Sequence, residues 1–321
     1  MKTILLRPTD PERDFSQIAA LFSNEQGEPV SESGLKQDYE EHKERIIRLI
    51  VAEDKQGELL GFNWAVRSRF EPNEIYFFLI VKPEKRKQGA GSRLYEDLLQ
   101  AAWDAQTKKL QVSIRDNRPE CRAFADKRGF AERSHFIELE LDLDAFDARP
   151  YERIIDQLRG EGFRFTTMEE LGNTEDAQRK LYDLNDTTAR EMPGSGGEPV
   201  WLSFEDFRSK VCLKEWYRPG GQIVAIDTAV NVWAAMSAIT RFEGSHHAYN
   251  LHTGVDRRYQ GRKLEQVMLA LALRHARYVL KSNRVHTDEN TLNQPMLAVY
   301  HEFGYAELPG TFSMEKLLEE M

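Results

Sequence analysis

Cysteine is scarce in this sequence. Only Cys121 and Cys212 occur among the 321 residues, far apart and without the spacing that metal ligands use. This scarcity excludes a disulfide framework and a cysteine-based zinc site, and it favours a reducing compartment.

Long hydrophobic runs are missing as well. No stretch approaches the ~18 consecutive apolar residues that a membrane-spanning helix needs. The first residues, MKTILLRPTDPERDF, lack the long apolar core of a signal peptide. We therefore expect a cytoplasmic protein that makes no membrane contact.

Positive charge is in deficit. Lysine and arginine number 44 against 53 aspartates and glutamates, which gives a formal net charge of −9. This balance argues against a nucleic-acid partner, because phosphate contacts require a basic face. It suits a soluble enzyme, including one that takes cationic substrates. A chain of this length, with 40% hydrophobic residues, predicts two domains of about 150 residues.

Three features occur twice in the chain and in the same order. They are GEPV at Gly27–Val30 and Gly197–Val200, the helix-forming stretches from Val81 and Val255, and the segments ending at Phe130 and Tyr305. The copies are 170, 174 and 175 residues apart. We therefore expect two copies of one domain.

The domain boundary is expected after the alternating, strand-like segment FIELELDL, within Asp144–Arg153. The domains then span 1–147 and 148–321. Each copy reads as a first strand, helices, two or three strands, a long helix, a short strand, a short helix and a final strand pair. This order predicts an α/β fold with a mixed sheet, an antiparallel meander followed by a β-α-β-α-β portion.

The stretch VKPEKRKQGAGSRLYEDLL, from Val81 to Leu99, joins an apolar strand to an amphipathic helix. Gly89 and Gly91 lie at the junction. Four basic residues precede them, namely Lys82, Lys85, Arg86 and Lys87. A helix N-terminus offers free N–H groups and partial positive charge, and glycine lets an anion approach the backbone. The stretch predicts a phosphate-binding turn, with a purely structural strand-to-helix turn as the open alternative.

Two common phosphate motifs do not fit this stretch. The GK[ST] ending of a Walker loop is missing. The third glycine and the downstream acidic residue of a dinucleotide-binding fingerprint are missing too. The spacing Val81-x-Pro83-x-x-Arg86-x-x-Gly89-x-Gly91, followed by Asn117 and then Gly129-Phe130, instead resembles the GNAT acetyltransferase superfamily. The resemblance covers the whole first copy and, more loosely, the second, so the chain is similar to tandem GNAT proteins.

This resemblance implies an N-acetyltransferase that moves an acetyl group from acetyl-CoA to an amine by direct attack, without a metal. The acceptor would be a small-molecule or peptide amine that the sequence does not identify. The strand residues beside the cofactor would be Leu79, Ile80 and Val81, with Leu79 and Val81 pairing with the pantetheine amides. The pyrophosphate would be held by backbone N–H groups of Arg86, Lys87, Gln88, Gly89, Ala90, Gly91 and Ser92.

The resemblance also implies contacts further along the chain. Asn117 would hydrogen-bond the pantetheine arm, although it is equally suited to be the N-cap of the helix that follows. Phe124, Lys127 and Arg128 would lie near the adenosine.

The catalytic residues match the family less well. Where members often have a tyrosine that protonates the leaving thiolate, the first copy has Ala125 and the second has Tyr300. Tyr300 is therefore a candidate general acid, or else a packed aromatic residue. Glu74, at the start of the strand that ends at Val81, is the candidate general base, or else an ordinary surface glutamate. His246, His247 and His252 are expected to be ordinary strand residues.

The turn of the second copy is degenerate. With an offset of 174 residues, Lys263 replaces Gly89 and Glu265 replaces Gly91, and a carboxylate there repels a pyrophosphate. An offset of 172 places Gly261 opposite Gly89 but disrupts the helical stripe. We expect the first copy to bind acetyl-CoA and the second to be structural or to shape the acceptor pocket. A non-catalytic acyl-CoA-binding protein, or a second copy that builds a homodimer, remain alternatives.

Overall fold

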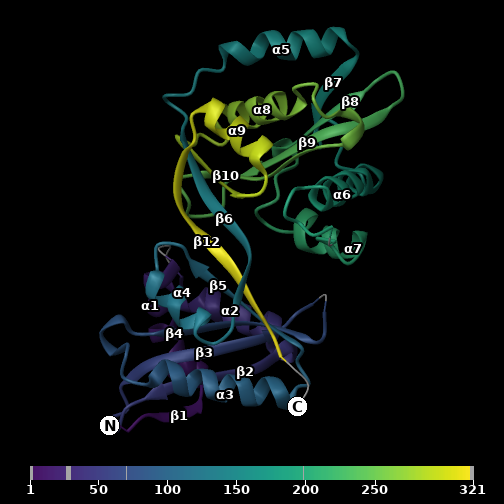
Figure 1. The fold of residues 1–321 in the computed structure, drawn as a ribbon. Helices are drawn as coiled ribbons and strands as arrows, with labels where there is room; N and C mark the ends of the chain where they lie inside the picture. Colours follow the sequence, from purple (N-terminus) through teal and green to yellow (C-terminus); the bar gives the residue numbers. More distant parts are fainter. Residues whose placement is uncertain (1–2, 27–29, 70, 198, 319–321) are drawn as a thin grey trace. The chain divides into compact units, whose positions relative to one another are not determined.

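The computed structural model describes residues 3–26, 30–69, 71–197 and 199–318 (Figure 1). The chain divides into two compact units. Unit 1 is Met1–Arg133 with Thr311–Met321, and unit 2 is Ser134–Gly310. The chain thus leaves unit 1 within strand β6 (Ala131–Asp142) and returns within strand β12 (Ala306–Leu317). The compact units therefore differ from the sequence copies in the strands that they contain.

Unit 1 alternates helices and strands in the order expected for the first copy. Its elements are β1 (Leu5–Pro8), α1 (Pro11–Gln26), α2 (Glu32–His42), β2 (Ile46–Glu53), β3 (Leu59–Arg67), β4 (Glu74–Val81), α3 (Ala90–Asp104), β5 (Lys109–Arg115) and α4 (Pro119–Asp126). Its strands follow the order β1-β2-β3-β4-β5-β12. The β4–β5 pair is parallel, and β12 pairs antiparallel with β5 from Thr311 to Leu317.

The sheet of unit 1 is covered by helices on both faces. Phe15 of α1 and Leu35 of α2 pack with Phe62 on one face. Leu98 of α3 packs with Ile75 on the other face, and α4 lies on that face as well. Successive strand residues point to opposite faces, so β3 and β4 supply both cores.

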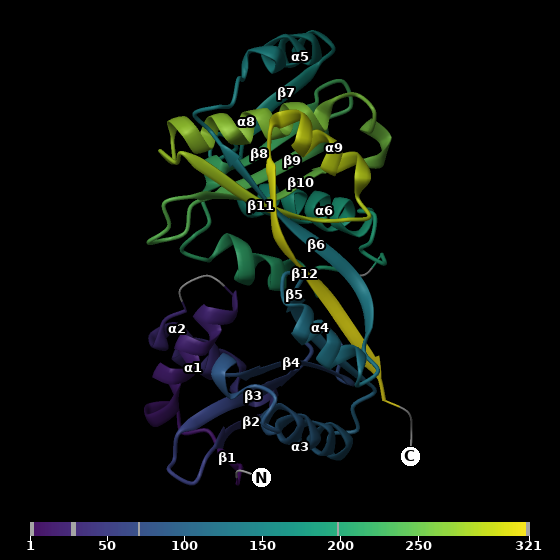
Figure 2. The same cartoon turned by 60° about the vertical axis from the view of Figure 1, so that its left-hand side comes forward.

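Unit 2 repeats this plan (Figure 2). Besides β6, its elements are α5 (Arg149–Gly160), β7 (Phe163–Thr167), α6 (Glu175–Arg190), α7 (Phe204–Phe207), β8 (Gln222–Asp227), β9 (Val232–Thr240), β10 (Ala248–Val255), α8 (Leu264–Tyr278), β11 (Arg284–Asn290) and α9 (Gln294–Phe303). Its strands follow the order β6-β11-β10-β9-β8-β7. Helices α5, α8 and α9 contribute to the core on one face, and α6 and α7 to the core on the other.

The two copies match element by element. Strands β4 and β10 have eight residues each and start 174 residues apart, and so do the fifteen-residue helices α3 and α8. Strands β5 and β11, and the starts of α4 and α9, are 175 apart. The internal repeat and the offset of 174 are therefore confirmed. The first GEPV segment lies mostly outside the described residues, as does Glu198 of the second.

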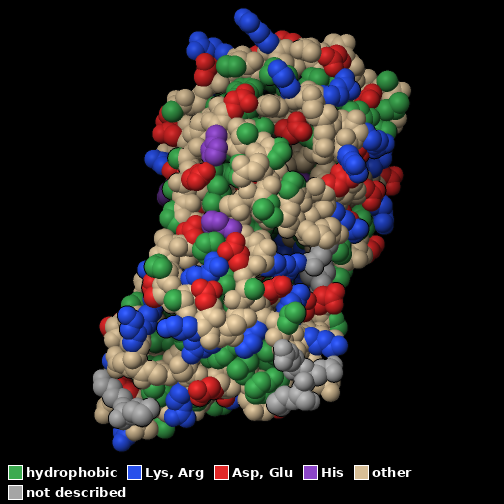
Figure 3. Space-filling model, viewed as in Figure 1, with side chains coloured by type: hydrophobic (Ala, Val, Ile, Leu, Met, Phe, Trp, Pro, Cys, Tyr) green, Lys and Arg blue, Asp and Glu red, His purple; other side chains and the backbone are tan. Residues whose placement is uncertain are grey.

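Acidic and basic side chains are interspersed over the face of the molecule drawn in Figure 3. Lys36, for example, lies 3.0 Å from a carboxylate oxygen of Glu12 and 3.2 Å from one of Glu32. The net negative charge is therefore not gathered into a single acidic patch on that face.

Candidate active site

The turn before α3 has the geometry of an anion-binding helix start. Gly89 is the N-cap of α3 in the left-handed conformation, with φ of +98°. The first bond of the turn runs from the Arg93 N–H to the Gly89 carbonyl, at 3.1 Å. The N–H groups of Ala90, Gly91 and Ser92 precede that bond, so the helix itself does not use them. These donors and the positive helix end suit a phosphate group.

Gly91 is needed because α4 packs against this first turn. A Cβ added at Gly91 would lie 3.3 Å from the ring of Phe124, which is tighter than ordinary contact. The Arg128 guanidinium lies 3.4 Å from the centre of the same ring and donates a hydrogen bond to Ser92 Oγ at 3.0 Å. The structure thus brings Ser92, Phe124 and Arg128 together at the start of α3. Lys127, the C-cap of α4, is exposed.

The direction of the β4 backbone groups follows from two hydrogen bonds to its neighbours. The Lys82 N–H donates to the Leu60 carbonyl at 2.9 Å, and the Ser68 N–H donates to the Glu74 carbonyl at 2.8 Å. Backbone groups alternate along a strand, so the even-numbered residues of β4 point their N–H and C=O toward β3. The odd-numbered residues therefore point toward β5.

That second edge of β4 is open along its later half. Parallel pairing with β5 covers only Glu74 to Tyr76. Beyond this pairing, the N–H and C=O groups of Leu79 face the opened side. The Val81 carbonyl accepts a hydrogen bond from Arg86 Nε at 3.1 Å. The backbone of Ile80 faces β3 instead. An extended chain with amide groups fits such an edge as an added strand.

The basic residues of the turn are engaged in ion pairs. Lys85 Nζ lies 2.7 Å from a Glu58 oxygen. Arg86 bridges Glu25 of α1 at 2.7 Å and Glu120 of α4 at 2.9 Å. An anion that reaches Arg86 therefore competes with two carboxylates. These partners had no sequence signal, because Glu25 precedes Arg86 by 61 residues.

Asn117 lies exposed in the turn between β5 and α4. The N-cap of α4 is Arg118, which makes no side-chain capping hydrogen bond. The alternative in which Asn117 caps this helix is therefore wrong. Its proposed contact with the pantetheine arm stays a prediction.

Glu74 lies at the paired end of β4. Its carboxylate forms an ion pair with Lys109 and accepts a hydrogen bond from Gln111 Nε2 at 2.9 Å. At about 3.3 Å per residue, Glu74 is roughly 23 Å along the strand from Val81. The structure thus separates Glu74 from the α3 turn, and its role as a general base stays a prediction.

Tyr300 belongs to α9 of unit 2 and is 2% exposed. Burial and the nearby Glu289 carboxylate raise the pKa of Tyr300 far above its ordinary value, despite a hydrogen bond with Thr287. Its ring lies edge-on to Tyr305, with centres 5.0 Å apart. Tyr300 is thus a packed aromatic residue, and its role as an acid stays a prediction.

The equivalent turn of unit 2 keeps the backbone path but loses the glycines. Lys263 is the left-handed N-cap of α8, with φ of +63°, and Gly261 has φ of +76° where Lys87 has +60°. Glu265 lies in the first helical turn. The backbone thus supports the same shape in both units, while the side chains at the helix start change from neutral to acidic.

Two groups of ligands were also considered. Among the described residues, no three His, Cys, Asp or Glu side chains gather as a metal site. In the same part of the chain, no helix has both the length and the apolar character that crossing a membrane requires.

Comparison with known proteins agrees with this geometry. Residues 15–130 match the model of the acetyltransferase (GNAT) family. No curated protein matches the chain in sequence.

Solved structures resemble the whole chain. One is a GCN5-related N-acetyltransferase from Sphaerobacter thermophilus, with 16% identity, a TM-score of 0.73 and coverage of 99% of this chain and 96% of that one. A tandem GNAT protein from the clavulanic acid biosynthesis pathway has 16% identity, a TM-score of 0.71 and coverage of 99% and 100%.

A third structure is larger than this chain. It contains a GCN5-related glucosamine N-acetyltransferase region in a fungal multi-domain GH3 β-N-acetylglucosaminidase, with 15% identity and a TM-score of 0.74. The match covers 98% of this chain and 38% of that one. At these identities the likeness concerns the fold. The chain is therefore a tandem GNAT-fold protein, and its residues 15–130 belong to the GNAT acetyltransferase family.

Proposed function

We propose that unit 1 binds acetyl-CoA and transfers its acetyl group to an amine by direct attack. One observation carries the proposal: the open edge of β4 at Leu79 leads into the left-handed turn at Gly89 and the free N–H groups of α3. The pantetheine amides would pair with Leu79, and the pyrophosphate would lie on the N–H groups from Arg86 to Ser92. A strand amide near Leu79 would polarise the thioester carbonyl.

The residues near the turn favour direct attack over an acyl-enzyme. Cys121 lies close by, with its Sγ 3.7 Å from a Glu25 oxygen. Burial and the Glu25 carboxylate raise the pKa of the Cys121 thiol to about 11. At neutral pH the thiol is protonated and is a poor nucleophile. Because Ala125 replaces the usual tyrosine, water would protonate the leaving thiolate.

We further propose that acetyl-CoA binds at one site per chain. Glu265 places a carboxylate in the first turn of α8, where a pyrophosphate would need a neutral or positive surface. Unit 2 would then support unit 1 or bind another ligand.

A matched pair of variants tests this assignment. Ser92 and Gln266 occupy the third position of α3 and α8, where glutamate is favourable for a helix. We expect Ser92→Glu to weaken acetyl-CoA binding at least tenfold and Gln266→Glu to leave it unchanged, as measured by calorimetry. Equal losses, or two sites in the wild-type protein, would contradict the assignment.

Transfer is tested separately from binding. We expect thiol release from acetyl-CoA in the presence of at least one member of a panel of small-molecule and peptide amines. The Ser92→Glu variant should lose this release. Tight binding without release for every amine would support a non-catalytic acyl-CoA-binding protein instead.

A further inference from the structure

Unit 2 contains a pocket that is lined only by its own residues. The pocket has a volume of about 370 Å³, at the small end of the range for ligand sites. Its floor lies where β10 and β11 separate, at Leu251, His252 and Asn290. Strand pairing here covers only Ala248 and Tyr249, and a β-bulge at residue 251 bends β10 away.

The walls of the pocket are mainly apolar and aromatic. They come from β6, from α6 and from the segment 192–201. Trp201 is fixed in place, because its Nε1 donates to Asn185 Oδ1 at 2.7 Å and its ring meets Phe207 edge-on. No Asp, Glu, Lys or Arg is among the described residues that line the pocket. A ligand with a full charge would find no counter-charge in this lining.

His252 does not supply a charge either. Its ring Nε2 lies 2.8 Å from Thr188 Oγ1. Burial lowers the pKa of His252 to about 4, so its imidazole is neutral at neutral pH. The expectation that His252 is an ordinary strand residue missed its place in this pocket.

Asn290 provides an unused hydrogen-bond donor. Its side chain is 1% exposed, and its Oδ1 accepts a hydrogen bond from the Leu292 N–H at 2.9 Å, which fixes the orientation of the amide. Its Nδ2 has no partner among the described residues. A buried donor without a partner is costly, and a ligand oxygen would remove that cost.

The segment over the pocket approaches Asn290 closely. A Cβ added at Gly194 would lie 2.4 Å from Asn290 Nδ2, and the φ of Gly194 is +87°. Only glycine fits both requirements. The close fit of Gly194 and the fixed Trp201 together make the pocket a preformed site.

We propose that this pocket binds a small uncharged molecule with an apolar ring and a carbonyl oxygen, which accepts a hydrogen bond from Asn290 Nδ2. The ring would lie against Trp201 and Leu251. This second ligand site goes beyond the proposed acetyl-CoA site of unit 1 and does not depend on it.

Three probes of equal size and different charge test the proposal on the full chain. They are benzamide, benzamidine and benzoate, which are neutral, cationic and anionic at neutral pH. We expect ligand-observed NMR to detect binding of benzamide or its uncharged ring-substituted analogues, with the two ions bound at least tenfold more weakly. Equal or tighter binding of either ion, or no binding of any uncharged member, would overturn the proposal.

Two variants locate the binding. Asn290→Asp keeps the oxygen that accepts from Leu292 but replaces the Nδ2 donor, and we expect binding about tenfold weaker. Ala189→Leu extends a side chain from α6 into the pocket and should also weaken binding. Thr187→Leu, on the exposed face of the same helix, is the control. Unchanged benzamide affinity in both pocket variants would refute the site, provided that melting temperature and acetyl-CoA affinity match the wild type.

Discussion

Gly89 and Lys263 occupy the same position in the two units, each as the left-handed N-cap of a fifteen-residue helix. Their φ angles are +98° and +63°. Glycine adopts this conformation freely, whereas a residue with a Cβ pays about 1 kcal/mol or more. The second unit thus keeps a backbone shape that its side chain opposes.

Lys263→Gly should therefore stabilise unit 2. We expect a gain of about 0.5 to 1 kcal/mol in the free energy of unfolding, because relief of the strained conformation exceeds the added entropy of unfolded glycine. Urea denaturation measures this change. The converse variant Gly89→Lys should cost about 1 kcal/mol, and a loss of stability in Lys263→Gly would argue against the assigned strain.

Glu25→Gln should strengthen the binding of acetyl-CoA. The Glu25 carboxylate holds Arg86 at 2.7 Å, and both side chains are about one-fifth exposed. Removing this competitor frees a guanidinium for the cofactor phosphates, and we expect an affinity about threefold higher by calorimetry. Glu40→Gln, which breaks an exposed pair with Lys43 on α2, is the control. An unchanged or lower affinity in Glu25→Gln would show that Arg86 does not contact the cofactor.

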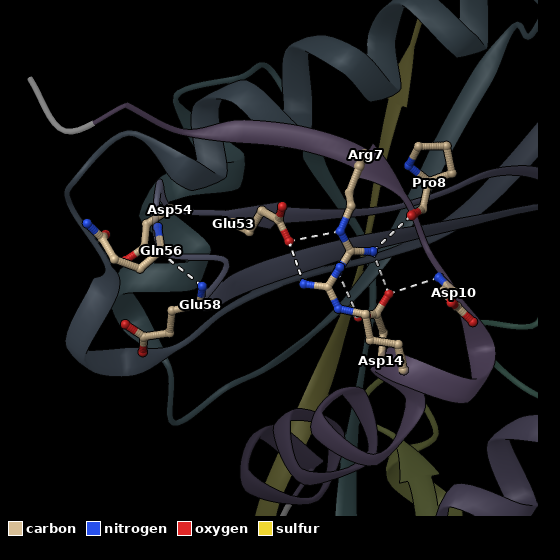
Figure 4. A network of polar contacts seen from close by, with 9 residues as sticks. Arg7, Pro8, Asp10, Asp14, Glu53, Asp54, Gln56 and Glu58 are labelled. Atoms are coloured by element: carbon tan, nitrogen blue, oxygen red, sulfur yellow. Dashed lines mark hydrogen bonds and ion pairs between the residues drawn. The ribbon is translucent and has the colours of Figure 1, made fainter.

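Asp14 should make unit 1 sensitive to acid. Its carboxylate accepts two hydrogen bonds from Arg7, at 2.7 and 2.8 Å, and one from the Asp10 N–H (Figure 4). Burial alone would raise the pKa of Asp14, but the hydrogen bonds from Arg7 and Asp10 outweigh it and hold the pKa below 3.8.

The sign of the pH effect follows from this lowered pKa. The contribution of Asp14 is present above pH 3.8, its ordinary value, and is lost as the pH falls through the lower folded value. Asp14→Asn should cost about 2 kcal/mol at pH 7, and this difference should shrink as the pH drops below 4. Denaturation curves between pH 2 and pH 7 would test it, and a difference independent of pH would contradict the assignment.

Glu289 should have the opposite effect on unit 2. Burial raises the pKa of Glu289 to about 7, although hydrogen bonds from Asn293 and the Asn290 N–H oppose the shift. The folded protein therefore keeps a proton that the unfolded chain releases near pH 4.5. The stabilising contribution is complete below pH 4.5 and is lost as the pH rises to about 7.

Glu289→Gln removes this titration while keeping an oxygen for the Asn290 N–H. Relative to the wild type, we expect the variant to gain about 3 kcal/mol of stability between pH 4.5 and pH 7. Glu265→Gln, which also lies in unit 2, is the control and should show no such trend. Parallel stability curves for wild type and Glu289→Gln would be inconsistent with a raised pKa.

The features that were predictable from the sequence are local ones. The turn at Gly89 follows from glycine, charge and helix periodicity within a few residues. The repeat of units followed from matching stripes in α3 and α8. The N-cap of α4 was misplaced by one residue, since Asn117 and Arg118 both precede Pro119 and either side chain could occupy that position.

The rest depends on contacts between distant segments. Nothing in the sequence near Arg86 indicates that Glu25 and Glu120 hold its guanidinium. The bulge at residue 251 has no glycine or proline to mark it. The unpaired Nδ2 of Asn290 exists because the amide is turned by Leu292, which is a matter of three-dimensional packing.

Strand β12 supplies the neighbour of β5 in unit 1, although its residues 311–317 are among the last that the ribosome makes. All of unit 2 is synthesised before this strand emerges. Until then, the edge of β5 from Lys109 to Arg115 lacks the partner that it has in the finished sheet. Completion of unit 1 during synthesis must therefore wait for the second half of the chain, and a fragment that ends at residue 147 would keep an open, aggregation-prone strand edge.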